Sequence, residues 1–129
     1  RIKDVVRRSG ENIAAREVEA VINAFDTITE SAVVPVKDDT RGEELKAIVV
    51  WREGAPCGDQ EIEALLDHCR RNLAPFKVPR YVECRPELPK TASGKIAKHV
   101  ILAEAPNLGS KIYDRVARGQ RGLTGAPHA

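Results

Sequence analysis

Two runs rich in β-branched residues, SAVVPV at 31–36 and LKAIVVW at 45–51, constrain the fold of this chain most strongly. Such residues favour extended backbone, and only the polar stretch KDDTRGEE separates the two runs. So short a connection predicts an antiparallel pair of strands. Pro35, in the first run, has no amide hydrogen to donate, so we expect it to face outward or to lie at an edge of the sheet.

Segments with helical periodicity lie on both sides of this pair. In AAREVEAVINAF, residues 14–25, apolar side chains recur at helical spacing and predict an amphipathic helix. The same pattern in DQEIEALLDHCRRNL, residues 59–73, predicts a second helix with Asp59 as its amino-terminal cap. A third, shorter helix is expected from Lys95 onward. His68, on the second helix, is expected to be a surface residue rather than a catalyst.

Shorter signals complete the layout. The stretch IKDVVRRSGEN predicts a β-hairpin at the amino terminus, and YVEC predicts a short strand. The chain has 129 residues, of which 42% are hydrophobic, enough for one core. We therefore predict a small α+β domain at 1–105, with an amino-terminal β-hairpin and a few-stranded sheet packed against about three helices. The basic, glycine-containing tail at 106–129 is expected to be partly disordered, with two helical turns in KIYDRVAR.

Charge and composition exclude several classes of protein. The chain has 21 basic and 19 acidic residues, too balanced for a nucleic-acid-binding face. No apolar run is long enough to span a membrane, which predicts a soluble protein. Three widely spaced cysteines, without a CxxC pair, predict free thiols in a reducing, cytoplasmic setting, with neither a disulfide framework nor a metal site. The lack of methionine and the start at Arg1 predict that the chain is a piece of a longer protein.

Near the carboxyl end, LPKTASGKIAKH at 88–99 places a lysine after a glycine in a turn rich in hydroxyl groups. The phosphate-binding loop G-x-x-x-x-G-K-[ST] is excluded, because Pro89 replaces its first glycine and Ile96 follows the lysine. What is left is an exposed turn that presents the cationic side chain of Lys95, which suits a phosphate or a developing oxyanion. From local chemistry alone, a plain surface lysine beside a turn is the open alternative.

This stretch resembles the last core motif of the adenylate-forming enzymes, the superfamily of acyl-CoA synthetases, peptide-synthetase adenylation domains and firefly luciferase. The opening RIKDVVRRSGENI is similar to the motif that begins the small carboxyl-terminal domain of those enzymes. Between the two motifs, the helix after ENI, the strand GEELKAIVV and the stretch LAPFKVPRYV also resemble that domain. Two motifs in the right order, separated by a domain of the expected kind, are more specific than either motif alone.

The resemblance implies a two-step reaction. Members of the superfamily use ATP and Mg²⁺ to convert a carboxylate to an acyl-adenylate, and then transfer the acyl group to a thiol such as that of CoA. Their large amino-terminal domain holds the ATP and acyl pockets, so the present chain by itself is expected to bind no cofactor and to be inactive. The small domain swings over the large one in two orientations, one for each step.

The resemblance also implies roles for residues in the first step. By its place in the motif, Lys95 is expected to enter the site and to stabilise charge on the carboxylate and the α-phosphate. The loop that carries it contains Thr91, Ser93 and Gly94. Lys3 falls at the hinge, although it could simply pair with Asp4 or a neighbouring strand. Arg1, in the same motif, would contact the nucleotide. In related enzymes this lysine is a target of acylation, which implies an acetyltransferase and a deacetylase as partners.

In the second step a face of the hairpin would replace the lysine loop. Its residues are Arg7, Gly10 and Asn12. A side chain at Gly10 would obstruct a pantetheine arm, and a turn that needs a positive φ explains this glycine equally well. Many relatives carry lysine in place of Arg7, and Arg7 and Arg8 could both be solvated charges beside the hairpin.

Two classes of function stay open. In the first, the chain is the mobile domain of an acid–CoA ligase, with the large domain of the same polypeptide, a carboxylic acid and CoA as its partners. In the second, it is a free-standing docking domain without chemistry of its own. Within the first class, the hinge lysine and the GEN after the hairpin resemble acyl-CoA ligases more than peptide-synthetase adenylation domains. The stretches DDTRGEELKA and LPKTASGK are similar to medium-chain or carnitine and crotonobetaine ligases, which implies fatty acid metabolism.

Overall fold

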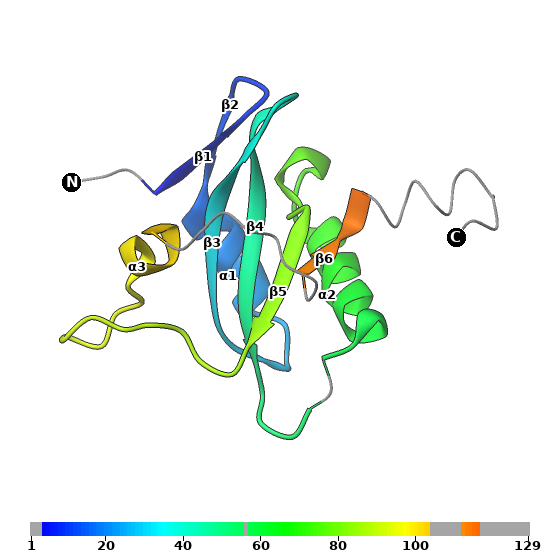
Figure 1. Cartoon of the computed structure of the whole chain (residues 1–129). Helices are drawn as coiled ribbons and strands as arrows, with labels where there is room; N and C mark the ends of the chain where they lie inside the picture. Colours follow the sequence, from blue (N-terminus) through cyan, green and yellow to red (C-terminus); the bar gives the residue numbers. More distant parts are fainter. Residues whose placement is uncertain (1–3, 56, 104–111, 117–129) are drawn as a thin grey trace.

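The computed structural model describes residues 4–55, 57–103 and 112–116 (Figure 1). The expectations for Arg1 and Lys3 therefore concern residues outside the described ranges, as do those for the tail apart from 112–116. The elements in chain order are β1 (Val5–Arg8), β2 (Glu11–Ala14), α1 (Ala15–Asn23), β3 (Ile28–Asp38), β4 (Gly42–Trp51), α2 (Asp59–Asn72), the 3-10 turn η1 (Pro75–Lys77), β5 (Tyr81–Arg85), α3 (Lys98–Ala103) and β6 (Ile112–Asp114).

These strands form one mixed sheet, which confirms the predicted α+β class. Its order is β2-β1-β4-β5-β6, with β3 also paired to β4. The predicted antiparallel pair is confirmed and is longer than expected, because β3 and β4 pair from Ile28 opposite Trp51 to Asp38 opposite Gly42. Among the described strands β3 pairs with β4 alone, so Pro35 lies on a strand with one unpaired edge, as predicted. The β5 strand runs parallel to β4.

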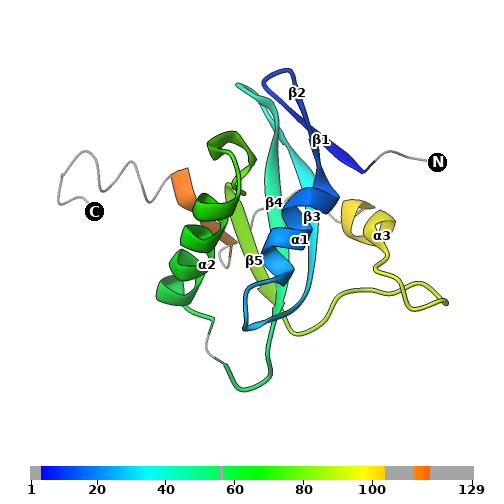
Figure 2. The ribbon, with the colours of Figure 1, turned by 180° about the vertical axis from the view of Figure 1, so that it is seen from behind.

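Both faces of β4 are buried, but against different parts of the chain. Leu45, Ala47 and Val49 belong to the core beneath α1 and α2, the two helices that lie on one face of the sheet (Figures 1 and 2). The alternate residues Ile48 and Val50 belong to a second cluster. Its other members are Ala32, Val34, Leu88 and Ile101. Since successive side chains of a strand point to opposite faces, the second face is covered by the segment that carries the lysine motif.

The helices agree with the periodicity, with two corrections at their first residues. Gly58, rather than Asp59, caps α2, and its amide donates a hydrogen bond of 2.9 Å to the Glu61 side chain. The α3 helix begins at Lys98 rather than Lys95, because Lys90 and Ile96 still pair as an antiparallel bridge.

Residues 112–114 differ from the expectation of helical turns. They form β6, which pairs antiparallel with β5. The Arg80 guanidinium holds this strand in place, with bonds of 3.0 and 3.2 Å to the two carboxylate oxygens of Asp114. This hydrogen bond to Asp114 is also the main reason why the pKa of Arg80 is raised. Without β6, one edge of β5 would have unpaired backbone N–H and C=O groups. Hydrogen bonds to these groups stabilise the strand more than the weak helical tendency of the segment stabilises a helix.

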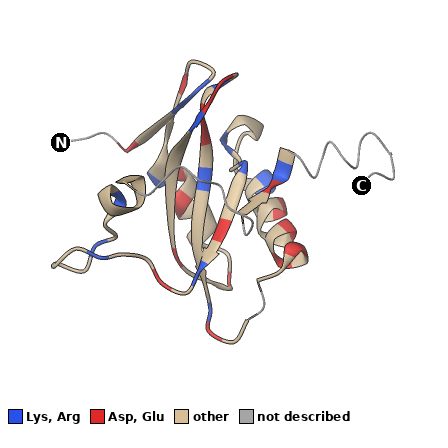
Figure 3. Cartoon of the chain, in the orientation of Figure 1, with Lys and Arg blue, Asp and Glu red and all other residues tan. Residues whose placement is uncertain are grey.

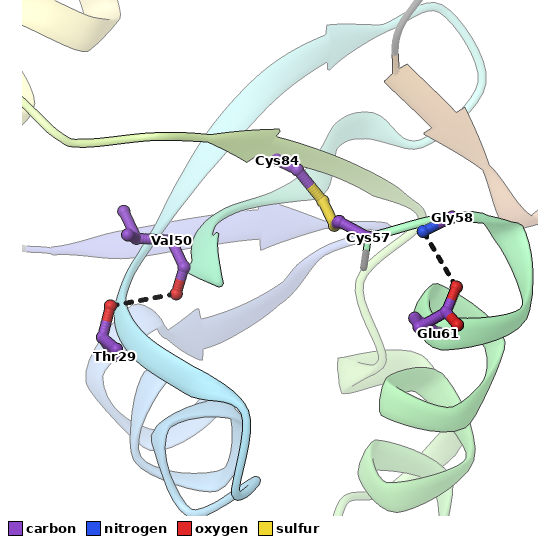
Figure 4. The surroundings of a disulfide bond; sticks show 6 residues. All are labelled: Thr29, Val50, Cys57, Gly58, Glu61 and Cys84. Carbon is purple, nitrogen blue, oxygen red and sulfur yellow. Dashed lines mark hydrogen bonds between the residues drawn. A yellow bond between two sulfur atoms is a disulfide. The ribbon is translucent and has the colours of Figure 1, made fainter. Parts of the chain in front are cut away.

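The cysteines correct a second expectation (Figure 4). Cys57, just before α2, and Cys84, on β5, form a disulfide across 27 residues of sequence. The prediction of three free cysteines is therefore wrong, and the argument from free thiols to a reducing compartment loses its basis. Spacing in the sequence could not show that the connection before α2 passes beside β5. Cys69 is free and buried, and burial raises its pKa to about 11.

A thiol titration tests this arrangement. In chain purified without reductant, we expect a thiol reagent to find almost no reactive group in the native state, because the pKa of Cys69 keeps it protonated. Unfolding without reductant should expose one thiol, and unfolding with reductant should expose three. Three thiols in the unfolded, unreduced chain would contradict the disulfide.

Candidate functional site

The lysine motif forms an ordered loop that projects from the sheet. Gly94 has φ +88°, a conformation that glycine adopts without strain, and its amide donates to the Thr91 carbonyl at 2.9 Å. The Thr91 amide donates to the Lys95 carbonyl at 2.7 Å, and the Lys95 amide donates to the Thr91 hydroxyl at 3.2 Å. The hydroxyls of Thr91 and Ser93 lie 3.1 Å apart. These hydrogen bonds fix the path of the main chain, so Lys95 leaves the loop in a defined direction.

Three lysines of the motif differ in what their amino groups contact. Lys90 Nζ lies 2.9 Å from Glu30 Oε2, and Lys98 Nζ is bonded to two carboxylates. Lys95 is exposed, and within the described ranges its amino group has neither an ion pair nor a hydrogen bond. Of these lysines, Lys95 is thus the one whose charge is available to a group outside the domain.

The predicted hairpin is confirmed, and its turn explains one glycine. Ser9 and Gly10, between β1 and β2, have φ of 52° and 84°. A Cβ atom placed on Gly10 would meet nothing within 4 Å in the described structure. The turn geometry therefore accounts for Gly10 within this domain.

The candidate residues of the hairpin come together on its exposed side. Arg7 and Asn12 face each other across the two strands, and Arg7 Nη1 donates a hydrogen bond of 2.9 Å to Asn12 Oδ1. The Arg7 amide also donates to Glu43 Oε1 at 2.8 Å. The hydrogen bond to Asn12 holds the Arg7 guanidinium on the exposed face of the β1–β2 pair.

Arg8 has a different role from that of its neighbour. Its Nε lies 2.8 Å from Oε1 of Glu44, and the two side chains are 13% and 3% exposed. Arg80 Nη1 lies 3.9 Å from the other oxygen of the same carboxylate. The alternative of a solvated charge is therefore wrong for Arg8, which neutralises a buried glutamate. Sequence reasoning missed Glu44, because a glutamate at the polar end of a strand gives no sign of burial.

The lysine loop and the turn of the hairpin lie in different parts of the domain. The β1–β2 turn is at the top of the molecule in Figures 1 and 2, whereas the loop before α3 projects sideways from a lower part, to the left in Figure 1 and to the right in Figure 2. The structure thus groups Arg7, Gly10 and Asn12 on one surface and sets Lys95 on another. To bring each surface in turn to the same site on another molecule, the domain would have to change its orientation.

The remaining features of the described residues are those of a supporting scaffold. His68 contacts the Val21 carbonyl at 2.8 Å and the Phe25 ring at 5.3 Å, so it joins α2 to α1. Basic and acidic residues are interspersed over the described strands and helices instead of collecting in one region (Figure 3). No group of side chains in the described ranges could hold a metal ion. Among the described helices, none has the length and apolarity required to cross a membrane.

The fold and these two surfaces define a small α+β domain with exposed cationic side chains at two separate places. Residues 17–95 match the family model of the AMP-binding enzyme C-terminal domain. The chain belongs to this family, and its resemblance to the carboxyl-terminal domain of acyl-CoA synthetases is confirmed.

Similar proteins are CoA ligases in several organisms. The chain is 44% identical to a long-chain-fatty-acid–CoA ligase of Bacillus subtilis, over 81% of the chain and 18% of that protein. It is 40% identical to an oxalate–CoA ligase of Arabidopsis thaliana, over 78% of the chain and 19% of that protein. A crystal structure of an acyl-CoA synthetase from Brucella canis matches with a TM-score of 0.74 and 35% identity, over 78% of the chain and 19% of the larger chain. The chain thus spans about a fifth of the length of these relatives.

Proposed function

We propose that this chain is the mobile carboxyl-terminal domain of an ATP-dependent, AMP-forming acid–CoA ligase. Membership of the family and the CoA ligases among its relatives support this function. The domain comprises residues 1–105, and the large amino-terminal domain of the same polypeptide is its main partner. We place the reaction in the cytoplasm, where both ATP and CoA are available.

The unpaired amino group of Lys95 is the observation that carries the proposal. In the first half-reaction the carboxylate oxygen attacks the α-phosphorus of ATP, and pyrophosphate leaves with the electron pair of the broken bond. Negative charge builds up on the oxygens around that phosphorus. An ammonium group held close to them stabilises this charge, and one that is already ion-paired would do so less well. Lys90 and Lys98 are paired, whereas Lys95 is exposed on a hydrogen-bonded loop.

In the second half-reaction the domain turns so that the hairpin faces the large domain. Arg7 and Asn12 then contact CoA near the path of its pantetheine arm, and Gly10 leaves that path open. The rotation occurs at Lys3, and Arg1 contacts the nucleotide. The hydrogen bond between Arg7 and Asn12 supports this assignment because it holds both polar groups on the exposed side of the hairpin.

The cofactors fit this chain to different degrees. The free cation of Lys95 fits an α-phosphate, which ATP supplies together with the leaving pyrophosphate. The described residues contain no cluster able to hold Mg²⁺. We therefore assign the metal, the adenine pocket and the acyl pocket to the large domain.

Lys95 is also the proposed target of a lysine acetyltransferase and a deacetylase. Its exposed amino group is accessible to a modifying enzyme, whereas the amino groups of Lys90 and Lys98 contact carboxylates. Acetylation removes the charge and keeps the side chain, so it would stop the first half-reaction without unfolding the domain.

The proposal is tested by measuring both half-reactions in the full-length polypeptide and in this domain alone. With ATP and a panel of carboxylic acids, the full-length protein should release pyrophosphate, and added CoA should then yield a thioester. The isolated domain should do neither. Pyrophosphate release by the isolated domain would contradict the assignment, and a full-length protein inactive with every acid would favour the docking-domain alternative.

A further inference from the structure

Lys98 connects the beginning of the domain to the end of the lysine loop. Its Nζ lies 2.6 Å from Oδ2 of Asp4 and 2.5 Å from Oε2 of Glu19. The Lys98 side chain is only 22% exposed, so solvent screens these contacts less than it screens most surface ion pairs. The Lys98 ammonium thus joins the end of the lysine loop to Asp4, the first described residue, which lies 94 positions earlier in the sequence.

The Glu19 carboxylate and the main chain of Asp4 are each held by a further hydrogen bond. Glu19 Oε2 accepts a hydrogen bond of 2.8 Å from the amide of Val33, on β3. The main-chain carbonyl of Asp4 accepts one of 2.9 Å from the amide of Ala15, at the start of α1. Because Asp4 and Glu19 are fixed to the sheet and the first helix, they set the position of the Lys98 ammonium.

Lys98 in turn fixes one side of the lysine loop. It is the first residue of α3, and the preceding Ala97 is buried and donates from its amide to the Pro89 carbonyl at 2.8 Å. On the other side of the loop, Lys90 is paired with Glu30. The loop therefore has two anchored ends, and the end at Lys98 leads directly to Asp4, where the described chain enters the domain.

We propose that Lys98 is a positioning residue for adenylate formation. Its ion pairs with Asp4 and Glu19 fix the direction of the Lys95 loop relative to the chain that enters the domain. This inference rests on the proposed function, because it requires Lys95 to be delivered to a site in the large domain. If the domain rotates about the segment through which the chain enters it, the final position of Lys95 depends on two quantities. These are the angle of the rotation and the angle between that segment and the lysine loop. Lys98 sets the second of these angles.

The magnitudes favour a geometric role over a stabilising one. Single ion pairs near a protein surface contribute little to folding stability. By contrast, misplacing a catalytic group by about 1 Å can lower a rate about a hundredfold. Loss of the Lys98 contacts should therefore be detected in the rate of the first half-reaction and hardly at all in the melting temperature.

The experiment uses Lys98→Met and Asp4→Ala in the full-length enzyme. Each should lower kcat for adenylate formation about tenfold or more, with the KM values for ATP and acid unchanged. Thioester formation from a supplied acyl-adenylate should stay normal, and Lys98→Arg should restore most of the lost kcat. Because both changes break the same link, the double variant should be no slower than the slower single variant.

Lys77→Met is the matched control. Lys77 Nζ lies 2.9 Å from Glu17 Oε1 with 24% of its side chain exposed, so its ion pair resembles that of Lys98 but lies away from the loop. It should leave both half-reactions unchanged. The inference is overturned if Lys98→Met keeps normal adenylation while Lys95→Ala loses it, if both half-reactions fall equally, or if Asp4→Ala has no effect. Normal adenylation by Lys95→Ala would instead overturn the proposed function.

Discussion

Replacing Lys95 with alanine in the full-length enzyme should slow adenylate formation by about a hundredfold to a thousandfold. The variant removes the one lysine of the motif whose amino group contacts no other described residue. The charge that develops at the α-phosphate then loses its stabilising cation. Thioester formation from a supplied acyl-adenylate should be nearly unchanged, because in the proposed rotation the loop is turned away from the site in that step. Single-turnover assays of each half-reaction measure the two rates separately.

Lys37→Ala provides the control for the loss of one positive charge. Lys37 is also exposed, but it lies on β3 rather than on the loop. It should leave both rates as they are. An equal fall of both half-reactions in Lys95→Ala would show that the lysine supports the structure of the domain instead of the chemistry.

Replacing Arg8 with methionine should destabilise the domain by about 3 kcal/mol. The substitution leaves the Glu44 carboxylate, with 3% of its side chain exposed, without its nearest cation. Arg80 lies farther from that carboxylate, at 3.9 Å, and compensates only in part. For a domain of this size, such a loss lowers the melting temperature by roughly 10–20 °C. Thermal and urea unfolding of the isolated chain measure it.

The neighbouring Arg7→Met is its matched control. Arg7 is exposed and its guanidinium is bonded to the exposed Asn12, so its removal should cost less than about 1 kcal/mol. A second variant, Arg8→Met with Glu44→Leu, should recover most of the stability, because the buried charge is then gone as well. Equal destabilisation by Arg7→Met and Arg8→Met would contradict the distinction between them.

Local patterns predicted most of the elements of this fold. The β-branched runs gave the long antiparallel pair, the apolar spacing gave α1 and α2, and the turn at Ser9–Gly10 gave the hairpin. Features that depend on residues far apart in the chain were not accessible in this way. The parallel pairing of β5 with β4, the strand at 112–114 and the disulfide between Cys57 and Cys84 all require knowledge of which segments lie side by side.

The candidate site shows the same division. The motif near the carboxyl end predicted Lys95, and the motif that opens the chain predicted Arg7 and Asn12. The motif could not show which of its lysines has a free amino group, because Glu30, Asp4 and Glu19 come from distant segments. Nor could it distinguish Arg7 from Arg8. Alternation along a strand places the two side chains on opposite faces, but only the buried Glu44 shows which of these faces points inward.

Leu88 and Ala97, on either side of the lysine loop, are both buried. The distance to which the loop extends is therefore independent of how the segment packs on the domain. These two side chains anchor the segment, whereas the exposed residues 92–95 between them make no contribution to either core cluster. One residue inserted there extends the chain by at most about 3.5 Å. The number of residues in the loop therefore determines how far the Lys95 ammonium extends from the domain. An enzyme of this design can be adjusted to a deeper or shallower pocket by changing that number, while the sheet and its helices keep their sequence.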